Sequence, residues 1–290
     1  MKTIATINFK GGVGKTTVTW CLADILANYG YNSKVLVFDL DAQMSLTQAI
    51  ALNESTGALN PGFGKWYEKA KQNKKTIFDA LDRFTTPNSS GVFDFGIGYD
   101  FIYQVTPNLH FVPSVEDLYW MELEVFDRSS VKEFIRRILA KIEHTKGLAK
   151  YDYILFDCPP SFTLLSYSVL SVCDLVIIPV NPDFFASYGV RLLIDSLRMR
   201  IEPFPVPKIG VFMNKAKTYG KRFTQETEFY WNEVVNGSNF AARQNSLRVK
   251  AFETRIPERV AIKRAITANG VPTDLVSPFK DLWTEIIQYI

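Results

Sequence analysis

One stretch, residues 10–17, constrains this chain more than any other. It reads Lys-Gly-Gly-Val-Gly-Lys-Thr-Thr and lies between a short apolar run at 3–8 and a helix-like segment at 16–28. Glycines let backbone N–H groups converge without obstruction by side chains, and the start of a helix adds a positive dipole end. A strand, a glycine-rich loop and a Lys-Thr pair that begins a helix together form an arrangement that holds nucleotide phosphates. The alternative is a glycine-rich turn without a ligand, and both the flanking segments and the spacing disfavour it.

The residue types inside this loop predict separate tasks. The amine of Lys15 can reach the β- and γ-phosphates of a nucleotide, and the hydroxyl of Thr16 can bind Mg²⁺. Relative to the pattern G-x-x-x-x-G-K-[ST], Phe9 replaces the first glycine, and a second lysine, Lys10, lies five residues before Lys15. The predicted nucleotide-binding residues of the loop are Gly11, Gly12, Val13, Gly14, Lys15, Thr16 and Thr17.

Apolar runs alternate with helical patterns along the rest of the chain. Unalternating apolar runs, such as 34–39 and 153–157, are typical of parallel strands buried on both faces. We therefore expect one α/β domain of the P-loop NTPase class over residues 1–290, with a mostly parallel, twisted β-sheet flanked by helices on both faces. Within it we expect an irregular surface insertion at about 57–75 and a closing helix at about 279–290.

Composition excludes several other classes of protein. The three cysteines show no metal-like spacing and lie in apolar segments, which favours buried free thiols, and two histidines are few for histidine-based chemistry. The longest apolar region, 164–180, contains Asp174 and several serines, so we expect a helix and a buried strand instead of a membrane span. No signal peptide is recognisable, and we expect a cytoplasmic location. A formal net charge of +3 permits contact with nucleic acid but does not demand it.

Acidic and amide side chains stand at the ends of predicted strands. Asp39 and Asp157 each end an apolar run, Asp41 lies two residues beyond Asp39, and Asn214 ends a later run. Ligands of an open parallel sheet bind beyond the carboxyl ends of its strands, and a loop-bound Mg²⁺ commonly needs a strand-end Asp. We expect Asp157 and Asp39 near the metal, Asp41 near the γ-phosphate, and Asn214 at an adenine edge. Solvated turn residues remain the alternative for each.

Three motifs, one glycine-rich and two that begin with an acid, together resemble those of a known family. Residues 10–17, then Asp39-Leu40-Asp41-Ala42-Gln43, then Asp157-Cys158-Pro159-Pro160 are similar to the motifs of the ParA/MinD family of deviant Walker A ATPases. The resemblance covers nearly the whole chain, and the doubled-lysine loop is its most specific part. Asp41-Ala42-Gln43 is close to the Asp-Pro-Gln of the ParA branch, from which Ala42 is a small departure.

This resemblance implies a role for each matched residue. Lys10 resembles the signature lysine, which crosses into the partner subunit's ATP in a face-to-face dimer, where it would stabilise charge like an arginine finger. Asp41 would orient the attacking water. The implied metal-site residues are Thr16, Asp39 and Asp157, and the implied catalytic residues are Lys10, Lys15 and Asp41. Asn214 would bind adenine, and backbone near Pro257 would close the base pocket.

Basic residues concentrate late in the chain and predict non-specific contact with DNA. Residues 243–264 contain only two acids, Glu253 and Glu258, against seven basic residues, which are Arg243, Arg248, Lys250, Arg255, Arg259, Lys263 and Arg264. Such groups neutralise phosphates without reading sequence, and dimerisation could double the surface. A second basic group at 215–222 has no acid. A solvated basic face is the alternative for both groups. We expect nucleoid association.

Two other activities in the same family compete with this interpretation. A MinD-like membrane-cycling ATPase needs a terminal amphipathic helix, and residues 279–290 offer an apolar face. Its polar side carries Asp281, Glu285 and only one base, Lys280, so an anionic membrane would repel it and core packing is favoured. The other is a different P-loop enzyme of the same branch. A nitrogenase-reductase-like protein would need cluster-ligating cysteines, and Cys158 and Cys173 do not follow such a pattern, while a synthetase-like metabolite ligase would need substrate motifs that the sequence does not show.

Partners follow only from the resemblance. It implies a homodimer when ATP is bound, Mg²⁺ as metal, and a cargo-adaptor protein whose short basic segment docks at the dimer seam and stimulates weak ATP hydrolysis. The cargo, whether plasmid, chromosome or a protein compartment such as a carboxysome, is not identified by any residue of the chain.

Overall fold

An eight-stranded sheet forms the centre of the computed structural model, in the order β10-β7-β6-β1-β5-β2-β4-β3. The model describes residues 1–51, 61–85, 101–121, 128–144, 150–201, 205–220, 222–259, 261 and 270–290. Its strands are β1 (Lys2–Thr6), β2 (Val35–Asp39), β3 (Tyr103–Gln104), β4 (Leu109–Val112), β5 (Tyr153–Asp157), β6 (Leu175–Val180), β7 (Lys208–Ala216) and β10 (Val249–Pro257). All neighbouring pairs are parallel except β3 with β4, which confirms the predicted fold class.

Strand β1 lies between β5 and β6, and this position organises the site. Because β1, β5 and β2 are parallel, their carboxyl ends meet at one edge. The register pairs Thr6 with Asp157 and Asp157 with Asp39, so the two predicted acids are neighbours in the sheet. The loop at 10–14 leaves β1 at the same edge. Topology thus brings the three predicted motifs together.

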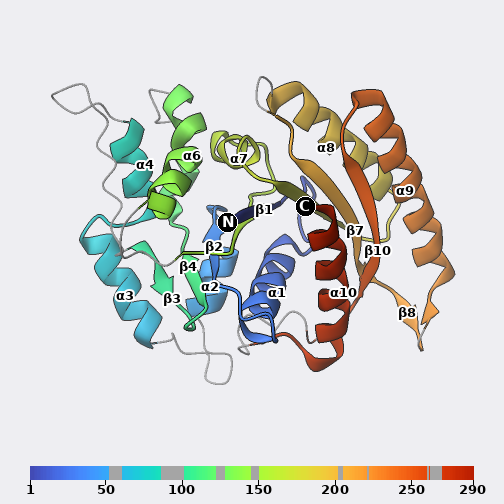
Figure 1. Ribbon diagram of the computed structural model, residues 1–290, viewed down its shortest axis with the longest axis horizontal. Coiled ribbons are helices and arrows are strands. Elements are labelled where there is room, and N and C mark those ends of the chain that lie inside the picture. The colour runs from blue at the N-terminus through green and yellow to red at the C-terminus, as the bar shows by residue number, and fades with distance from the viewer. Residues whose placement is uncertain are drawn as a thin grey trace.

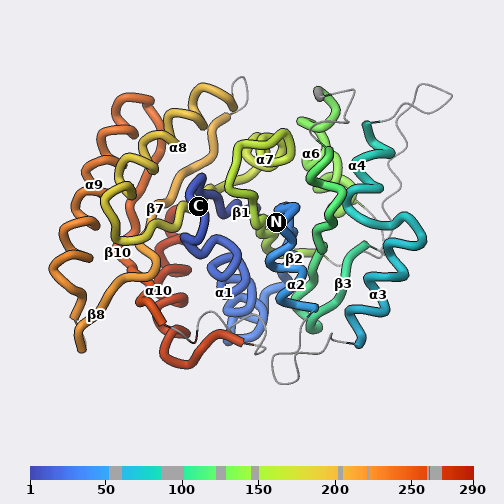
Figure 2. Tube along the Cα trace, turned by 180° about the vertical axis from the view of Figure 1, so that it is seen from behind, coloured from blue at the N-terminus to red at the C-terminus, as the bar shows by residue number. Residues whose placement is uncertain are grey.

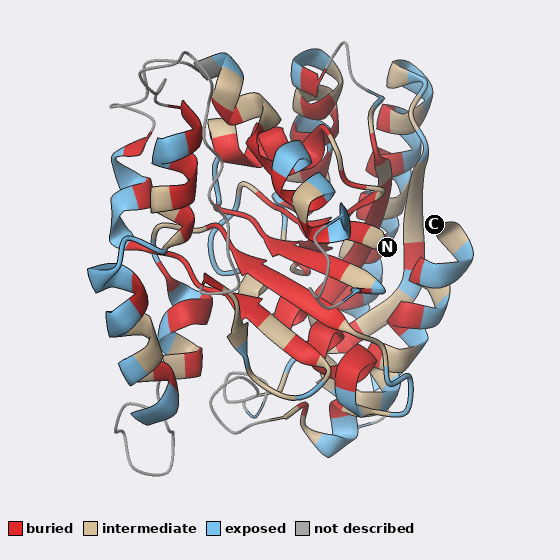
Figure 3. Cartoon of the chain, turned by 60° about the vertical axis from the view of Figure 1, so that its left-hand side comes forward, coloured by how far each residue is buried: buried red, intermediate tan, exposed pale blue. Residues whose placement is uncertain are grey.

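Helices cover both faces of the sheet (Figure 1). The helices and the short 3-10 segment η2 are α1 (Lys15–Asn28), α2 (Ser45–Ala51), α3 (Pro61–Gln72), α4 (Ile77–Thr85), η2 (Glu116–Tyr119), α6 (Arg128–His144), α7 (Leu164–Leu170), α8 (Ala186–Ile201), α9 (Gln225–Asn245) and α10 (Thr273–Tyr289). One core packs α1 and α10 against the sheet, and the other packs α4, α6, α7, α8 and α9. The strands between them are almost wholly buried, as their colouring in Figure 3 shows.

The predicted irregular insertion at 57–75 is wrong for its described part. Residues 61–72 form helix α3, while 57–60 lie outside the described residues. Pro61 occupies the first helical position, where a missing N–H costs nothing. Phe63 and Ala70 are buried, and Trp66 and Tyr67 lie against Tyr103 and Phe63 in an aromatic cluster. The seven-residue spacing of the two buried positions is helical, a signal that the glycines obscured.

The closing helix is longer than predicted. Helix α10 begins at Thr273 and not near Phe279, with Pro278 inside it. Proline lacks the N–H of one helical hydrogen bond, so it suggested a helix start, but the loss of a single bond in the second turn is tolerated here. Leu282, Trp283 and Ile286 are buried, which confirms core packing of this helix.

Cys21, Cys158 and Cys173 are buried free thiols, as predicted. Within the described ranges, no helix is both long enough and apolar enough to cross a bilayer. The chain also contains a small hairpin that was not predicted, formed by β8 (Thr218–Tyr219) and β9 (Arg222–Phe223), which extends from the carboxyl end of β7 (Figure 2).

Candidate nucleotide site

The glycine loop connects β1 to α1 in a conformation that only some residues tolerate. Gly12 and Gly14 have φ of 73° and 90°, in the left-handed region that favours glycine. A Cβ atom at Gly14 would lie 2.5 Å from Nδ2 of Asn214, so this position also lacks room. The loop backbone and the start of α1 therefore take the conformation of an anion-binding turn.

Lys15 is buried within this loop. It is only 8% exposed, and its Nζ atom lies 3.4 Å from the carbonyl oxygen of Lys10. Burial lowers the pKa of the Lys15 amine, and the nearby carboxylates of Asp157 and Asp41 act in the opposite direction. A buried amine beside a glycine loop, with carboxylates near enough to favour its charged form, is the electrostatic arrangement of a phosphate site.

Asp39 and Asp157 form a buried pair of carboxyl groups beside the loop. They are 0% and 1% exposed. Asp39 accepts hydrogen bonds from the backbone N–H and hydroxyl of Thr47, at 2.9 and 2.7 Å. Burial raises the pKa of Asp39 to about 6, and these hydrogen bonds offset it only in part. Burial, and then the charge of Asp39, raise the pKa of Asp157 well above its usual range, while a hydrogen bond with Thr16 lowers it.

This donor set fits Mg²⁺. Oδ1 of Asp157 is buried and has no hydrogen-bond partner among the described residues. Hydroxyl and carboxylate oxygens are the ligands that Mg²⁺ prefers, and in nucleotide sites it keeps several waters and phosphate ligands. The described residues contain no group of three or more His, Cys, Asp or Glu that could hold a metal unaided. Thr16 and Asp157, with Asp39 behind them, would hold the ion together with a nucleotide.

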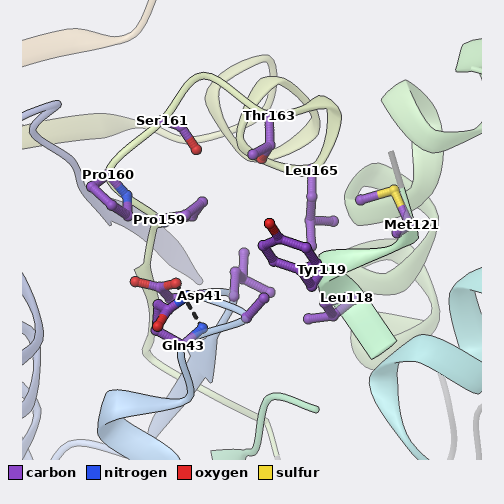
Figure 4. Close-up of a pocket in the computed structure, with 12 residues that line it drawn as sticks. Asp41, Gln43, Leu118, Tyr119, Met121, Pro159, Pro160, Ser161, Thr163 and Leu165 are labelled. Carbon is purple, nitrogen blue, oxygen red and sulfur yellow. Dashed lines mark hydrogen bonds between the residues drawn. The ribbon is translucent and has the colours of Figure 1, made fainter. Parts of the chain in front are cut away.

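Asp41 lies beyond this pair, on the turn that follows β2. Its Oδ1 atom accepts the backbone N–H of Gln43 at 2.9 Å, and its carbonyl accepts the Ser114 hydroxyl at 2.8 Å. A cavity of about 260 Å³ opens beside it, between the turns that follow β2, β4 and β5. Figure 4 shows the Asp41 carboxylate and the Tyr119 ring on facing sides of this cavity. A group that entered the cavity would contact Asp41 directly.

Lys10 is placed very differently from Lys15. Its Nζ atom lies 2.5 Å from Oδ2 of Asp183, a residue on the turn after β6, and the two side chains are 46% and 33% exposed. Its backbone N–H donates to Oδ1 of Asn8 at 2.9 Å. The amine is therefore held at the rim of the site. Sequence reasoning missed Asp183, which lies three residues beyond the end of β6, whereas Asp39 and Asp157 are the last residues of their strands.

Asn214 contacts the glycine loop itself. It is 2% exposed, and Nδ2 donates to the carbonyl of Val13 at 2.7 Å. The next residue, Lys215, donates from Nζ to the carbonyl of Gly12 at 2.5 Å. Pro257 pairs with Ala216 in the neighbouring strand, so the two predicted adenine-site residues lie at adjacent strand ends. The hydrogen bond between Lys215 and the loop was not predicted.

The described DNA-contact candidates are spread over the end of α9, the edge strand β10 and the residues that flank it. Arg243 and Arg248 are exposed near the amino end of β10. At its other end, Arg255 pairs with Glu228 at 2.5 Å, with its side chain 14% exposed, and Arg259 pairs with Asp274 at 3.1 Å. Lys250 lies between these groups, with Nζ over the Phe252 and Tyr289 rings. Two predicted members, Lys263 and Arg264, lie outside the described residues.

A parallel sheet with a glycine loop on its central strand, a buried Lys-Thr pair and strand-end acids defines the class of P-loop NTPases. The AAA domain family model matches residues 1–203 of the chain. Soj, the sporulation initiation inhibitor protein of Bacillus subtilis, is 28% identical over 284 residues, which cover 96% of this chain and 92% of Soj. The cell division protein PomZ of Myxococcus xanthus is 31% identical over 192 residues, which cover 66% of this chain and 50% of PomZ.

Among solved structures, the ATP complex of a McdA variant from Cyanothece is similar, with a TM-score of 0.72 at 19% identity. The aligned region covers 99% of this chain and 96% of McdA, and at this identity the likeness shows the fold. The chain spans about half the length of the first curated relatives that it matches. The chain belongs to the ParA/MinD family of P-loop ATPases, in its ParA branch.

Proposed function

We propose that this protein is a Mg²⁺-dependent ATPase that dimerises around ATP, binds DNA non-specifically and positions or segregates a cargo. The observation that carries the proposal is the contrast between the two loop lysines. Lys15 is buried in its own site, whereas Lys10 is held at the rim by Asp183, from which it could reach a nucleotide of a second copy. The separate environments of the lysines support separate roles.

Each residue of the site then has a chemical task. The Lys15 ammonium and the loop N–H groups of Gly11 to Thr17 bind the β- and γ-phosphates. Asp41 accepts a hydrogen bond from the water that attacks the γ-phosphate and orients it. Mg²⁺, held through Thr16 and Asp157, would supply charge neutralisation for the phosphates. Lys10 of the second copy stabilises the charge that develops on the transferring group.

Adenine would bind where β7 and β10 end. Asn214 and the backbone near Pro257 lie at the ends of adjacent strands. Lys215, the residue after Asn214, contacts the glycine loop. The buried Oδ1 of Asn214 has no hydrogen-bond partner among the described residues, so it is an acceptor for which the protein supplies no donor. An exocyclic amine of adenine is a donor of that kind.

DNA contact is proposed for the exposed bases at the amino end of β10. Arg243 and Arg248 are exposed, and the described residues show no ion pair within 4.0 Å for either of them. Arg255 and Arg259 are paired with acids, so their charge is less available to phosphates. We therefore place the DNA surface mainly on Arg243, Arg248 and Lys250, together with Lys263 and Arg264, which were predicted from the sequence.

A membrane-cycling function is not favoured. The apolar face of α10 would have to leave the protein to enter a bilayer, but Phe279, Leu282 and Ile286 are each 0% exposed. Exposing three such side chains would cost several kcal/mol, at about 1.5–3 kcal/mol each. The cargo adaptor is proposed as a protein that stimulates hydrolysis, and the cargo as a plasmid, a chromosome or a protein compartment.

Oligomeric state provides the decisive test. We expect an Asp41→Ala chain to bind Mg-ATP without hydrolysing it and to elute as a dimer in size-exclusion chromatography with light scattering. The same chain without nucleotide should be a monomer, and a Lys10→Ala/Asp41→Ala chain should stay monomeric in ATP. An Asp41→Ala chain that remains a monomer in saturating Mg-ATP would contradict the sandwich dimer.

A further inference from the structure

Ser114 joins three parts of the molecule around the candidate site. It lies two residues beyond the end of β4, and Asp41 lies two residues beyond the end of the neighbouring strand β2. The Ser114 hydroxyl donates to the carbonyl of Asp41 at 2.8 Å, and the Ser114 N–H donates to Oγ1 of Thr47 at 2.9 Å. The Ser114 carbonyl accepts the hydroxyl of Tyr67, on α3, at 2.7 Å. Each polar group of Ser114 therefore has a partner within the protein, and the residue is 0% exposed.

The turn that carries Asp41 has an unusual backbone conformation. Met44 has a φ of 56°, in the left-handed region that residues other than glycine seldom adopt. Its N–H donates to the carbonyl of Asp41 at 2.8 Å, and this is the same oxygen that accepts the Ser114 hydroxyl. Such a conformation costs free energy and persists only where the surrounding structure holds it. Ser114 supplies one of the holding hydrogen bonds from outside the turn.

The carboxylate of Asp41 is bound to the backbone of this turn. Its Oδ1 atom accepts the N–H of Gln43 at 2.9 Å, a hydrogen bond that Figure 4 shows beside the cavity. The N–H of Asp41 donates to Oδ1 of Asp39 at 3.2 Å, and Oδ2 of Asp39 accepts the Thr47 hydroxyl at 2.7 Å. A displacement of the turn backbone would therefore displace the carboxylate as well.

Tyr67 extends the same set of hydrogen bonds to helix α3. Its ring stacks on the Phe63 ring with centroids 5.5 Å apart, inside the aromatic cluster of α3 and β3. Burial, and then the charge of Glu116, raise the pKa of the Tyr67 hydroxyl, so this group stays protonated and donates to Ser114 at neutral pH. Helix α3 is thereby connected to Asp41 through a single buried residue.

We infer that Ser114 is the positioning residue of the Asp41 carboxylate and that Tyr67 holds Ser114 in place. The role of Asp41 in orienting the attacking water is taken from the proposed function, on which this inference rests. The polar groups of Ser114 are all used within the protein, so this residue acts through the Asp41 backbone and not on phosphate or water. Loss of its hydroxyl should slow the chemical step and spare nucleotide affinity, because a misplacement of about 1 Å can cost on the order of 100-fold in rate.

Steady-state hydrolysis of Mg-ATP by the full chain provides the test, with a phosphate-release assay giving kcat and KM. Ser114→Ala removes the hydroxyl that donates to the Asp41 carbonyl. Tyr67→Phe keeps the aromatic ring and removes only the hydroxyl that donates to Ser114. The second variant is the milder one, and it decides the matter if Ser114→Ala does not fold.

Each variant has a matched control. Ser168→Ala also removes a hydrogen-bonded hydroxyl from a serine that is 0% exposed, but this hydroxyl accepts the N–H of Ile135 between α7 and α6. Tyr103→Phe removes a hydroxyl from the same aromatic cluster as Tyr67, and this hydroxyl has no hydrogen-bond partner among the described residues. Urea denaturation of all four chains shows how far each substitution lowers stability.

We expect Ser114→Ala to lower kcat by about tenfold or more and to leave KM within about twofold of the native value. Tyr67→Phe should lower kcat by about threefold, because it removes one neutral hydrogen bond. Both controls should keep the native kcat, even where the urea midpoint falls. An unchanged kcat in either Ser114→Ala or Tyr67→Phe would overturn the inference. So would an equal loss of kcat in Ser168→Ala, or a loss that appears in KM and not in kcat.

Asp41→Ala separates failure of the proposed function from failure of this inference. An Asp41→Ala chain that hydrolyses ATP at the native rate would contradict the proposed role of Asp41, and the role of Ser114 would fall with it. An inactive Asp41→Ala chain beside a fully active Ser114→Ala chain would contradict the role of Ser114 alone.

Discussion

The nucleotide site and the basic segment at β10 make an instructive pair. Both were predicted from short runs of sequence, but only the first became one compact site. Residues 10–16 form one loop in which Lys15 is buried, and Asp39 and Asp157 lie beside this loop. The described bases of the second region extend from the end of α9 along the nine-residue strand β10 to the residues after it, and the strand alone is about 30 Å long at 3.3 Å per residue. Two of them are already paired with acids.

The difference lies in what each pattern constrains. A glycine loop at fixed spacing between a strand and a helix determines its own backbone geometry. Its residues therefore lie close together whatever the surrounding structure is. A count of basic residues dictates no geometry, and neighbours decide which charges stay available. Glu228 on α9 and Asp274 on α10 are such neighbours, and each lies on a different element from the arginine that it pairs with.

The largest expected effect comes from Lys15. Lys15→Ala removes the buried cation that the loop directs at the phosphates, and we expect ATP turnover to fall by about 100-fold or more. Lys10→Ala, at the exposed position, should leave ATP binding nearly intact while it abolishes dimer-dependent turnover. Isothermal titration with ATP and a phosphate-release assay separate the two. Equal loss of ATP affinity in both variants would show that the two lysines share one role.

A glycine substitution tests whether the loop backbone is as constrained as its geometry indicates. Gly14→Ala places Cβ 2.5 Å from Asn214 at a φ of 90°, so we expect a loss of about 1–3 kcal/mol in the free energy of unfolding. Gly11→Ala is the control, because its added Cβ meets nothing within 4 Å. Urea denaturation measures both. Adding Asn214→Ala to Gly14→Ala should recover only part of the loss, since the unfavourable φ remains.

Two arginines test the basic region. Arg248→Ala removes an exposed charge, so DNA affinity should fall several-fold for any sequence and the slope of log K against log salt should drop by about 1. Arg255→Ala should barely change DNA binding but lower stability by about 1 kcal/mol, because that side chain contacts Glu228, Phe223 and Trp231. Anisotropy titrations at several salt concentrations and thermal melts distinguish them. A large DNA effect from Arg255 alone would reverse this assignment.

The smallest expected effect concerns Asp174, remote from both regions. Burial tends to raise the pKa of Asp174, but hydrogen bonds from Thr3 and Lys2 outweigh it and hold the pKa below its usual value. A lowered carboxyl pKa adds stability above the unfolded value near 4, and that stability is lost as pH falls through the folded value. Asp174→Asn should therefore cost about 1 kcal/mol at pH 7, after allowance for its partial exposure, and almost nothing near pH 2. Equal losses at both pH values would show that charge is not involved.

The sequence by itself determined the class of fold, the loop and the strand-end acids. Unalternating apolar runs predict parallel strands, because both faces of such strands are buried. The acids at the ends of these strands then lie at one edge of the sheet. Asp39 and Asp157 were predicted from that rule, and the sheet register places them side by side. The closing helix, α10, was also predicted from the sequence, but with a start near residue 279, because Pro278 obscured the helical pattern of its first turns.

Only the tertiary structure decided which side chains meet across long separations. The contacts of Lys10 with Asp183 and of Lys215 with Gly12 join residues about 170 to 200 positions apart, and no local pattern encodes them. Helix α3 depends in the same way on the Tyr103 and Phe111 rings that its Phe63 contacts. The hydrogen bonds of Ser114 with Tyr67 and Asp41 were invisible in the sequence, because hydroxyl groups outside a motif look alike until the fold places a partner beside them.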